Sequence, residues 1–338
     1  MKRRMFLMSG ALAAPAIVPG PVLGQVPRER EKDFRILVGF EAGGGADAVA
    51  RAIAVQLQRR TSRRVRVENK TGTYGAMPGE VVRKGAPDGA DLALLSSTTL
   101  VSRLANKDFP YDPAKDLVPV MQAGTFPIAL AVAPALPVGN FDEYLKWLKE
   151  DDPDRRKIAV SSNTTFVHVF NVLLKQAVGE TLETVQYRGV LPILADMRDG
   201  KVPATVNTLT SLLPPHRGKR VRILLTTGGQ RLKAAPNIPT ATELGFPRLD
   251  MEEWFGFFVA PKTPQSTVAD LNDTLRRVME DPEMVGLMSP LGLTVKTSTP
   301  EELTALIGAH RKLWQARMEY TGVALANGAT GIPLPTSP

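Results

Sequence analysis

The segment from Ile36 to Arg51, ILVGFEAGGGADAVAR, constrains the fold more than any other part of the chain. A short apolar run leads into three consecutive glycines, Gly43 to Gly45, and Asp47 then opens a helical pattern. A strand that turns through glycines into a helix leaves the first backbone N–H groups of that helix unpaired. The positive end of the helix dipole lies at the same place. The pattern therefore predicts a strand–turn–helix unit whose turn is suited to binding an anion.

The first 24 residues have the pattern of a secretory signal. Three basic residues at positions 2–4 precede an apolar, alanine-rich stretch over 5–18, and small residues follow up to Gln25. The apolar stretch is too short to span a bilayer. We therefore expect residues 1–24 to be removed on export to the periplasm. The two adjacent arginines resemble the twin-arginine type of signal, and a general-secretion signal is the alternative.

The composition is that of a globular protein with a core of its own. Hydrophobic residues make up 43% of the 338 residues and charged residues 22%, which is ordinary and allows one large or two medium domains. Removal of residues 1–24 lowers the formal net charge from +8 to +5. The basic residues form small clusters without interleaved aromatic residues, which argues against nucleic-acid binding. The chain has no cysteine, so the exported protein is expected to fold without disulfides.

Strand-like and helix-like segments alternate along the chain from Phe34 onward. Strands are predicted at 35–40, 65–68, 91–96, 117–123, 128–133, 158–161, 183–186, 204–207, 221–226 and 256–260. Helices are predicted at 46–60, 76–84, 141–150, 166–177, 191–198, 240–244, 265–279, 282–291 and 300–321. Such alternation is typical of an α/β protein with largely parallel sheets.

The glycine turn also fits a dinucleotide-binding fingerprint. Gly43, Gly45 and Ala48 match G-x-G-x-x-A after a strand, and Glu68 ends the next predicted strand, where a ribose-binding acid would fall. The secretory signal argues against this interpretation, because nicotinamide cofactors are scarce outside the cytoplasm. A phosphate-binding P-loop is excluded, because no Gly-Lys-Ser/Thr follows the turn.

Recognisable catalytic and metal-binding motifs are absent from the sequence. His168, His216 and His310 are far apart and show no paired-ligand spacing, so no zinc site is predicted. Neither a G-x-S-x-G elbow nor an S-x-x-K motif occurs. A Ser-His-Asp triad assembled from distant residues is an alternative that sequence leaves open. We therefore predict no metal, no cofactor and no catalytic residue.

A second strand–loop–helix unit follows the strand predicted at 158–161. Its loop reads Ser161-Ser162-Asn163-Thr164-Thr165 and precedes a helix that carries His168. A helix cap requires one such residue, so five polar residues in succession favour a ligand contact. His168 is flanked by valines, which favours packing over ligand binding.

Three further polar residues end predicted strands. Tyr187 and Arg188 follow the strand at 183–186, and Asn207 closes the strand at 204–207. Arg188 can pair with a carboxylate, although a surface position is the commoner outcome for arginine. Tyr187 is more often a packing residue, and Asn207 is equally suited to forming a turn.

A series of short motifs occurs in a characteristic order over residues 34–321. They are Gly39 to Asp47 with Arg51, Val67 to Gly72 with Gly75 and Gly79, Ala86 to Gly89, Tyr111 to Pro113, Asp116 to Val120, Gln186 to Gly189, Ile238 to Thr240 with Glu243 to Gly245, and Trp254 to Gly256 with Ala260 to Pro264. Each motif is weak alone. Together they resemble the Bug family of periplasmic solute receptors, the binding components of tripartite tricarboxylate transporters.

The resemblance implies a two-lobed periplasmic-binding-protein fold of type II, flytrap-like, with a central ligand cleft. Residues 25–125 and 229–338 would form lobe 1, and residues 126–228 lobe 2. A small carboxylate would lie between the lobes. By position, the family's ligand contacts correspond to Phe40, Glu41, Ala42, Gly43, Gly44, Asp47, Ser161, Ser162, Asn163, Thr164, Thr165 and Asn207. His168, Tyr187 and Arg188 complete the predicted ligand-binding set.

The chain departs from the family pattern at several places. Gly39 stands where the family usually has proline, and Glu41 where it has a small residue or proline. An acid in an anion-binding loop repels the ligand unless it points outward. Residues 163–165 replace a glycine-containing run, Val190 replaces a small polar residue, and Pro203 replaces an acid. The expected fold is unaffected, and the identity of the ligand stays open.

The sequence therefore predicts an exported, monomeric solute-binding receptor without catalytic activity. It would capture a small organic acid and deliver it to the membrane permease subunits of a tripartite tricarboxylate-type transporter. We expect no nucleic-acid partner and no membrane insertion once the signal is removed. Two alternatives are an exported dinucleotide-dependent oxidoreductase and an orphan receptor that signals to a sensor kinase.

Overall fold

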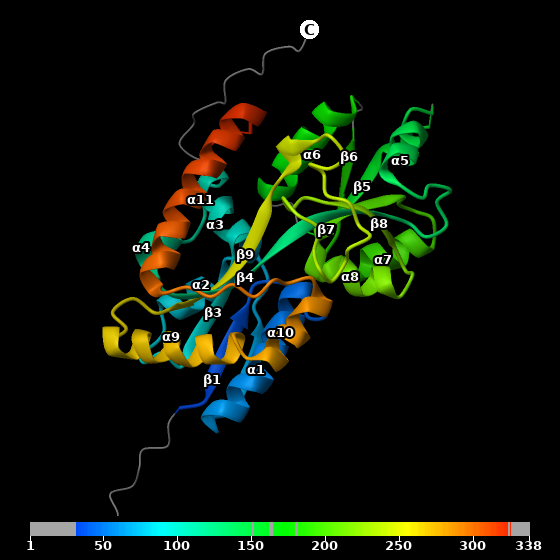
Figure 1. The fold of residues 1–338 in the computed structure, drawn as a ribbon. Coiled ribbons are helices and arrows are strands. Elements are labelled where there is room, and N and C mark those ends of the chain that lie inside the picture. Colours follow the sequence, from blue (N-terminus) through cyan, green and yellow to red (C-terminus); the bar gives the residue numbers. More distant parts are fainter. Residues whose placement is uncertain (1–31, 151, 162–164, 180–181, 324, 326–338) are drawn as a thin grey trace, which may run out of the picture. The chain divides into compact units, whose positions relative to one another are not determined.

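The computed structural model describes residues 32–150, 152–161, 165–179, 182–323 and 325. The predicted signal, residues 1–24, and the loop residues Ser162, Asn163 and Thr164 lie outside the described residues. The described chain is an α/β protein with helices on both faces of one curled sheet (Figure 1). The predicted α/β class is confirmed.

The sheet contains both parallel and antiparallel pairs of strands. The described strands are β1 (Phe34–Val38), β2 (Val65–Asn69), β3 (Asp91–Ser96), β4 (Val118–Val132), β5 (Lys157–Val160), β6 (Glu183–Gln186), β7 (Ala204–Thr208), β8 (Arg222–Thr226) and β9 (Glu252–Val259). Their order is β2-β1-β3-β9-β4-β7-β5-β6, and β8 also pairs with β4. Strands β2, β1 and β3 form one parallel group, and β7, β5 and β6 form another.

Antiparallel pairing by β4 and β9 joins these two parallel groups. The prediction of a largely parallel sheet is therefore wrong. The error has a physical origin, because side chains alternate with a period of two in both kinds of strand and apolar patterning does not report direction.

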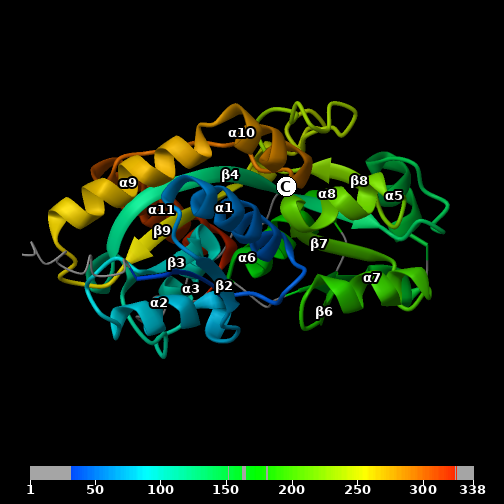
Figure 2. The same cartoon turned by 90° about the horizontal axis from the view of Figure 1, so that it is seen from below.

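Strand β4 runs through both parts of the sheet (Figure 2). Its first part, Val118–Pro127, pairs with β9, and its second part, Ile128–Val132, pairs with β7 and β8. The sequence predicts two separate strands here, and that separation is wrong. Pro127 lies where the partner strands change, a position that tolerates a residue without an N–H group. The predicted lobe boundary at 125/126 falls inside β4, and the division into lobes stays a prediction.

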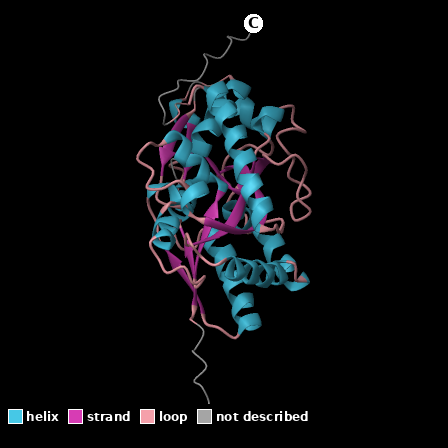
Figure 3. Ribbon diagram, turned by 90° about the vertical axis from the view of Figure 1, so that its left-hand side faces the viewer, coloured by secondary structure: helices cyan, strands magenta, loops and turns pink. Residues whose placement is uncertain are grey.

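Helices pack around the strands of the sheet (Figure 3). They are α1 (Gly45–Thr61), α2 (Met77–Arg83), α3 (Ser97–Ala105), α4 (Pro113–Asp116), α5 (Phe141–Leu148), α6 (Thr165–Val178), α7 (Val190–Arg198), α8 (Leu209–Arg217), α9 (Gln265–Met279), α10 (Pro282–Met288) and α11 (Pro300–Thr321). Short 3₁₀ turns occur at Thr73–Gly75, Pro153–Arg156, Pro247–Leu249 and Ser289–Leu291.

The sequence misses α3, α4 and α8 and wrongly predicts a helix at 240–244. Helix α3 begins with hydroxyl residues, which usually favour caps over helix interiors, and α8 contains Pro214 and Pro215, which normally interrupt a helix. At 240–244, Thr240 and Glu243 exchange the hydrogen bonds of a helix start. The segment remains a turn because Gly245, with φ +89°, reverses the chain after it.

Two large apolar clusters hold the helices against the sheet. In one, α1, α9 and α10 cover β1, β3 and β9. In the other, α5, α6 and α11 cover β4, β5 and β7, and the fully buried Trp314 lies 4.9 Å from Phe166 between ring centroids. Burying one large apolar side chain contributes about 2–3 kcal/mol. The clusters therefore fix the positions of these helices on the sheet.

None of the described helices is long and apolar enough to cross a bilayer.

Candidate functional site

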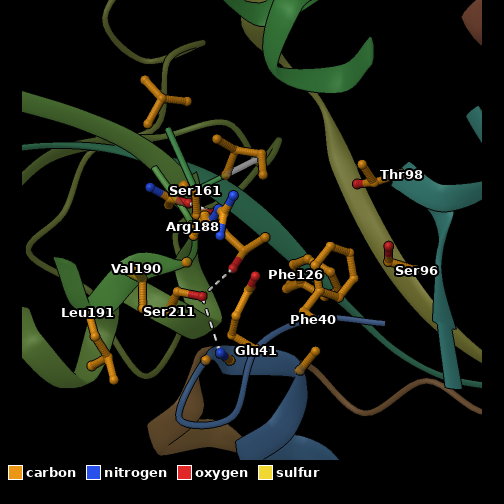
Figure 4. A pocket seen from close by; sticks show the side chains of 18 of the residues that line it. Phe40, Glu41, Ser96, Thr98, Phe126, Ser161, Arg188, Val190, Leu191 and Ser211 are labelled. Atoms are coloured by element: carbon orange, nitrogen blue, oxygen red, sulfur yellow. Dashed lines mark hydrogen bonds between the residues drawn. The ribbon is translucent and has the colours of Figure 1, made fainter. Parts of the chain in front are cut away.

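The described residues enclose a cavity of about 170 Å³. Its walls come from the β1–α1 loop, from the first residues of α3, α7 and α8, and from β4, β7 and β9 (Figure 4). Strand ends and helix starts are the usual positions of binding sites in α/β proteins. The lining residues are Phe40, Glu41, Ala42, Gly44, Gly45, Ala46, Ser96, Thr98, Phe126, Ile128, Ser161, Phe166, Arg188, Gly189, Val190, Leu191, Pro192, Val206, Asn207, Thr208, Ser211 and Phe255.

Glycines set the path of the β1–α1 loop. Gly43 has φ +80°, in the left-handed region that favours glycine. A Cβ on Gly39 would lie 2.4 Å from the carbonyl oxygen of Gly75, and a Cβ on Gly45 would lie 2.2 Å from Thr210 Oγ1. The loop therefore packs against two neighbouring segments too closely for a side chain. This packing accounts for glycine at position 39.

Asp47 fixes this loop from within α1. Its carboxylate accepts hydrogen bonds from Gly43 N–H at 2.9 Å, Arg51 Nε at 2.9 Å and Asn69 Nδ2 at 3.0 Å. Asn69 Nδ2 also donates to the carbonyl oxygen of Phe40 at 3.0 Å. Burial alone would raise the pKa of Asp47, but the hydrogen bonds outweigh it, so the pKa is lowered. Asp47 is therefore ionised and positions the loop, and it does not line the cavity.

Residues at three helix starts line the cavity. Ala46 in α1, Val190 and Leu191 in α7, and Ser211 in α8 line it, and within the described part of the chain their N–H groups have no hydrogen-bond partner. The helix dipole adds positive potential at each of these ends. A carboxylate in the cavity can therefore accept hydrogen bonds from several directions.

Hydroxyl and amide groups connect these helix starts. Ser211 Oγ accepts from Gly45 N–H at 3.2 Å and lies 2.9 Å from Thr208 Oγ1. Ser161 Oγ donates to Asn207 Oδ1, and the Asn207 amide is 5% exposed.

Asn207 Nδ2 then donates to Thr205 Oγ1 at 2.7 Å, and Thr205 Oγ1 donates to the carbonyl oxygen of Ala159 at 2.8 Å. These two hydrogen bonds fix the orientation of the Asn207 amide. The Ser161 proton is used, so its oxygen keeps lone pairs that can accept from a ligand.

The other side of the cavity is apolar. The rings of Phe126 and Phe255 lie 4.5 Å apart between centroids, and Phe40 lies beside Phe126, away from Ser211 (Figure 4). Phe166, Ile128 and Val206 add to this surface. The sequence predicts Phe40 in the site but misses the others, because an apolar residue within a strand has the same pattern whether it is core or pocket wall. A ligand of this pocket would present an apolar portion to this side.

Glu41 and Arg188 are the two ionisable side chains among the described residues that line the cavity. Glu41 is half-buried and lies against Gly189, where a Cβ on the glycine would be 3.4 Å from Glu41 Oε2. Gly189 has φ +88° and precedes α7. Within the described part of the chain the side chains of Glu41 and Arg188 have no hydrogen bond and no ion pair. Both charges therefore remain available to a ligand.

A second glutamate closes the start of α3 behind the cavity. Glu253 Oε2 accepts from Ser97 Oγ and from Thr98 N–H, both at 2.8 Å, and from the Thr98 hydroxyl. Glu253 is fully buried, and its Oε1 has no partner among the described residues. Burial raises the pKa of Glu253 to about 7, although these hydrogen bonds oppose the shift. The sequence pattern does not indicate that Glu253 is buried, since this residue stands beside the apolar residues of β9.

The structure brings part of the predicted ligand-binding set together. The predicted residues that line the cavity are Phe40, Glu41, Ala42, Gly44, Ser161, Arg188 and Asn207. Gly43 and Asp47 support the loop from outside the cavity. Ser162, Asn163 and Thr164 are outside the described residues, and Thr165 and His168 lie in α6 with side chains that are also outside them.

Tyr187 is turned away from the cavity. Its hydroxyl donates to Asp196 Oδ2 at 2.9 Å, and Lys201 Nζ donates to Asp196 Oδ1 at 2.9 Å. Burial together with the Asp196 contact raises the pKa of Tyr187 to about 12. Tyr187 therefore anchors the loop before α7.

Two features bear on cofactor and metal binding. Glu68, the acid of the dinucleotide fingerprint, lies 3.2 Å from Lys70 Nζ and 3.7 Å from Arg35 and does not line the cavity. The described residues contain no group of three or more His, Cys, Asp or Glu side chains that could hold a metal ion.

Comparison with known proteins identifies the family. The family described as "Tripartite tricarboxylate transporter family receptor" matches residues 49–323. The chain belongs to this family. The resemblance to the Bug family of solute receptors is thereby confirmed, and the family consists of solute-binding receptors.

Individual relatives agree with this assignment. A UPF0065 protein from the tcbD–tcbE intergenic region of Pseudomonas sp. strain P51 is 30% identical over 280 residues, which are 82% of this chain and 83% of that protein. The periplasmic binding protein BugD has a similar structure, with a TM-score of 0.80, 25% identity and coverage of 87% of this chain and 98% of BugD. R. palustris Rpa4515, solved with adipate, shares the fold with a TM-score of 0.82 at 24% identity, over 88% and 99% of the two chains. The predicted periplasmic-binding-protein fold is confirmed.

Proposed function

We propose that this receptor is exported to the periplasm, binds a small organic acid reversibly and delivers it to the permease subunits of a tripartite tricarboxylate-type transporter. The cavity carries the proposal, because it is lined by the starts of α1, α7 and α8, whose first N–H groups have no partner among the described residues. Such an arrangement stabilises a carboxylate through several weak dipoles, and Arg188 adds one full positive charge. Family membership supports the delivery step.

The size of the cavity favours a small ligand over a dinucleotide. Pockets for drug-sized ligands usually enclose about 300–1,000 Å³, whereas this one encloses about 170 Å³. A dinucleotide is larger than a typical drug, and Glu68 lies outside the cavity. These observations weigh against the oxidoreductase alternative.

The ligand class is tested by thermal shift followed by calorimetry on the purified mature protein. The panel contains mono-, di- and tricarboxylates, with sugars and simple amines for comparison. We expect at least one carboxylate to raise the melting temperature and to bind with one-to-one stoichiometry. A clear response to a sugar or a simple amine, with none to any acid, would overturn the ligand class. Nicotinamide or flavin absorbance in the purified protein would favour the oxidoreductase.

Delivery to a permease is tested in cells. Deletion of the receptor gene should abolish uptake of the radiolabelled ligand at low external concentration, and the wild-type gene should restore it. Unchanged uptake, accompanied by loss of a ligand-induced transcriptional response, would instead assign the protein to signalling through a sensor kinase.

A further inference from the structure

The charges inside the cavity distinguish between classes of organic acid. Among the described lining residues, the ionisable side chains are one acid, Glu41, and one base, Arg188. They sum to zero. A dicarboxylate would bring two negative charges to this balanced pair, whereas a zwitterion would bring one charge of each sign. Electrostatic complementarity of this kind determines specificity more than it determines raw affinity.

Glu41 is held in the cavity without a partner of its own. Its side chain lies against Gly189, where a Cβ would be in van der Waals contact with the Glu41 carboxylate. It is half-buried and has no hydrogen bond to any described residue. A carboxylate that loses water without gaining a partner destabilises the unliganded site. A cationic group on the ligand would remove that deficit.

Other acids in the neighbourhood receive hydrogen bonds from the protein itself. Asp47 receives three hydrogen bonds, and Glu253 Oε2 also receives three. Among the described residues, the lack of hydrogen-bond donors at the Glu41 carboxylate is therefore not a general property of acids near these helix starts. Ser161 adds to the cavity lining an oxygen that can accept a further hydrogen bond.

The remaining wall specifies the body of the ligand. Phe40, Phe126 and Phe255 form an aromatic surface beside the charged groups (Figure 4). A ligand that fills the cavity therefore needs an apolar portion in addition to its charged groups. A small, strongly hydrated di- or tricarboxylate would leave this surface uncovered.

Building on the proposed carboxylate-binding function, we propose that the receptor selects a zwitterionic acid with an apolar body. The carboxylate is bound by the helix starts and Arg188. The cationic nitrogen is bound by Glu41, and the apolar body lies on the phenylalanine surface. Glu41 is then the residue that determines specificity for the nitrogen-bearing acid.

Two matched sets of three compounds test the proposal by calorimetry. The aromatic set is phenylalanine, 3-phenylpropionate and 2-phenylethylamine, and the aliphatic set is leucine, 4-methylpentanoate and 3-methylbutylamine. Within each set the carbon skeleton is nearly constant, and the charged groups are both present, acid only or amine only. We expect the zwitterion of at least one set to bind at least tenfold more tightly than the corresponding acid, and the amine to bind weakly.

Two variants separate the roles of the charges. In Glu41→Gln the affinity for the zwitterion should fall about tenfold, because a hydrogen bond to a charged group becomes a neutral one, while the affinity for the acid stays equal or rises. In Arg188→Gln the acid and the zwitterion should weaken by similar factors. Both variants should keep the melting temperature of the wild type, because Glu41 and Arg188 support no other described residue.

The outcomes separate this proposal from the proposed function. Equal wild-type affinities for acid and zwitterion, or equal weakening of both by Glu41→Gln, would overturn the zwitterion and leave the carboxylate receptor standing. Tight binding of a dicarboxylate with no response to the amino acids or to betaines would do the same. Binding of the amines alone would overturn both.

Discussion

Glu253 and Glu41 both lie at helix starts around one cavity, and their surroundings differ. Glu253 is fully buried at the start of α3, where one of its oxygens accepts three hydrogen bonds from Ser97 and Thr98. Glu41 is half-buried against Gly189 at the start of α7 and has no partner among the described residues. Glu253 therefore serves as a fixed hydrogen-bond acceptor at the start of α3. The charge of Glu41, at the start of α7, has no partner in the described part of the protein and is available to a ligand.

This contrast shows that burial and donors decide the role of an acid at a helix start. Negative charge is favourable at both positions because of the helix dipole. Where donors converge, the acid becomes part of the folded core. Where they do not, its charge can be used in binding. Each prediction below changes one side of this comparison.

The largest effect is expected from Glu253→Ala. The substitution leaves three buried donors without an acceptor and opens a cavity, and each of these changes is destabilising. We expect the free energy of unfolding to fall by about 3–5 kcal/mol, measured by urea denaturation at pH 6. The matched change Glu41→Ala should alter it by no more than about 0.5 kcal/mol. Similar losses for the two variants would show that the contrast between the acids is not real.

The second prediction concerns the pH dependence of stability. The pKa of Glu253 is raised from 4.5 to about 7 in the folded protein, so between these values the native state holds a proton that the unfolded chain has released. Stability from this group is complete below pH 4.5 and is lost as pH rises through 7. The loss amounts to about 3 kcal/mol by pH 8.

The variant Glu253→Gln isolates this contribution, because it cannot ionise. The difference in unfolding free energy between Glu253→Gln and the wild type should move in favour of the variant by about 3 kcal/mol from pH 4.5 to 8. A difference that stays constant with pH would mean that Glu253 titrates normally.

A third acid, Asp47, resembles Glu253 in its donors but remains ionised. Hydrogen bonds from Arg51, Gly43 and Asn69 outweigh burial and lower its pKa. Asp47→Asn should cost about 1–2 kcal/mol near neutral pH. This contribution is present above the unfolded pKa, near 3.8, and disappears as pH falls through the lowered folded pKa.

The control for Asp47 is Asp273, which also pairs with an arginine four residues later but is exposed. Asp273→Asn should change stability by less than about 0.5 kcal/mol. Urea denaturation at pH 7 and at pH 3 measures both variants. If Asp47→Asn lowers the free energy of unfolding no more than Asp273→Asn does, Asp47 does not support the loop.

The sequence predicts the site around Glu41 better than the surroundings of Glu253. Glu41, Arg188 and Asn207 follow or end predicted strands, so their places near strand ends are predictable from local patterning. Glu253 stands at the start of an apolar strand, and its partners Ser97 and Thr98 are more than 150 residues away. No local pattern encodes such a contact. The same limitation hides Phe126 and Phe255 in the pocket wall and the reversal of direction at β4 and β9.

The smallest predicted effect tests the contact between Glu41 and Gly189. Gly189 and Gly200, which flank α7, both have left-handed backbones, with φ +88° and +74°. Alanine at either position should therefore cost about 1 kcal/mol in stability. A Cβ at Gly189 would lie 3.4 Å from Glu41 Oε2, whereas one at Gly200 would have no neighbour within 4 Å.

Only Gly189→Ala should therefore alter binding. The added methyl group restricts the Glu41 carboxylate, and we expect the affinity for the bound acid to fall about threefold, equivalent to about 0.6 kcal/mol. Gly200→Ala should bind like the wild type at the same melting temperature as Gly189→Ala, as measured by calorimetry and thermal shift. Equal affinities in the two variants would show that the position of Glu41 against the start of α7 has no part in ligand binding.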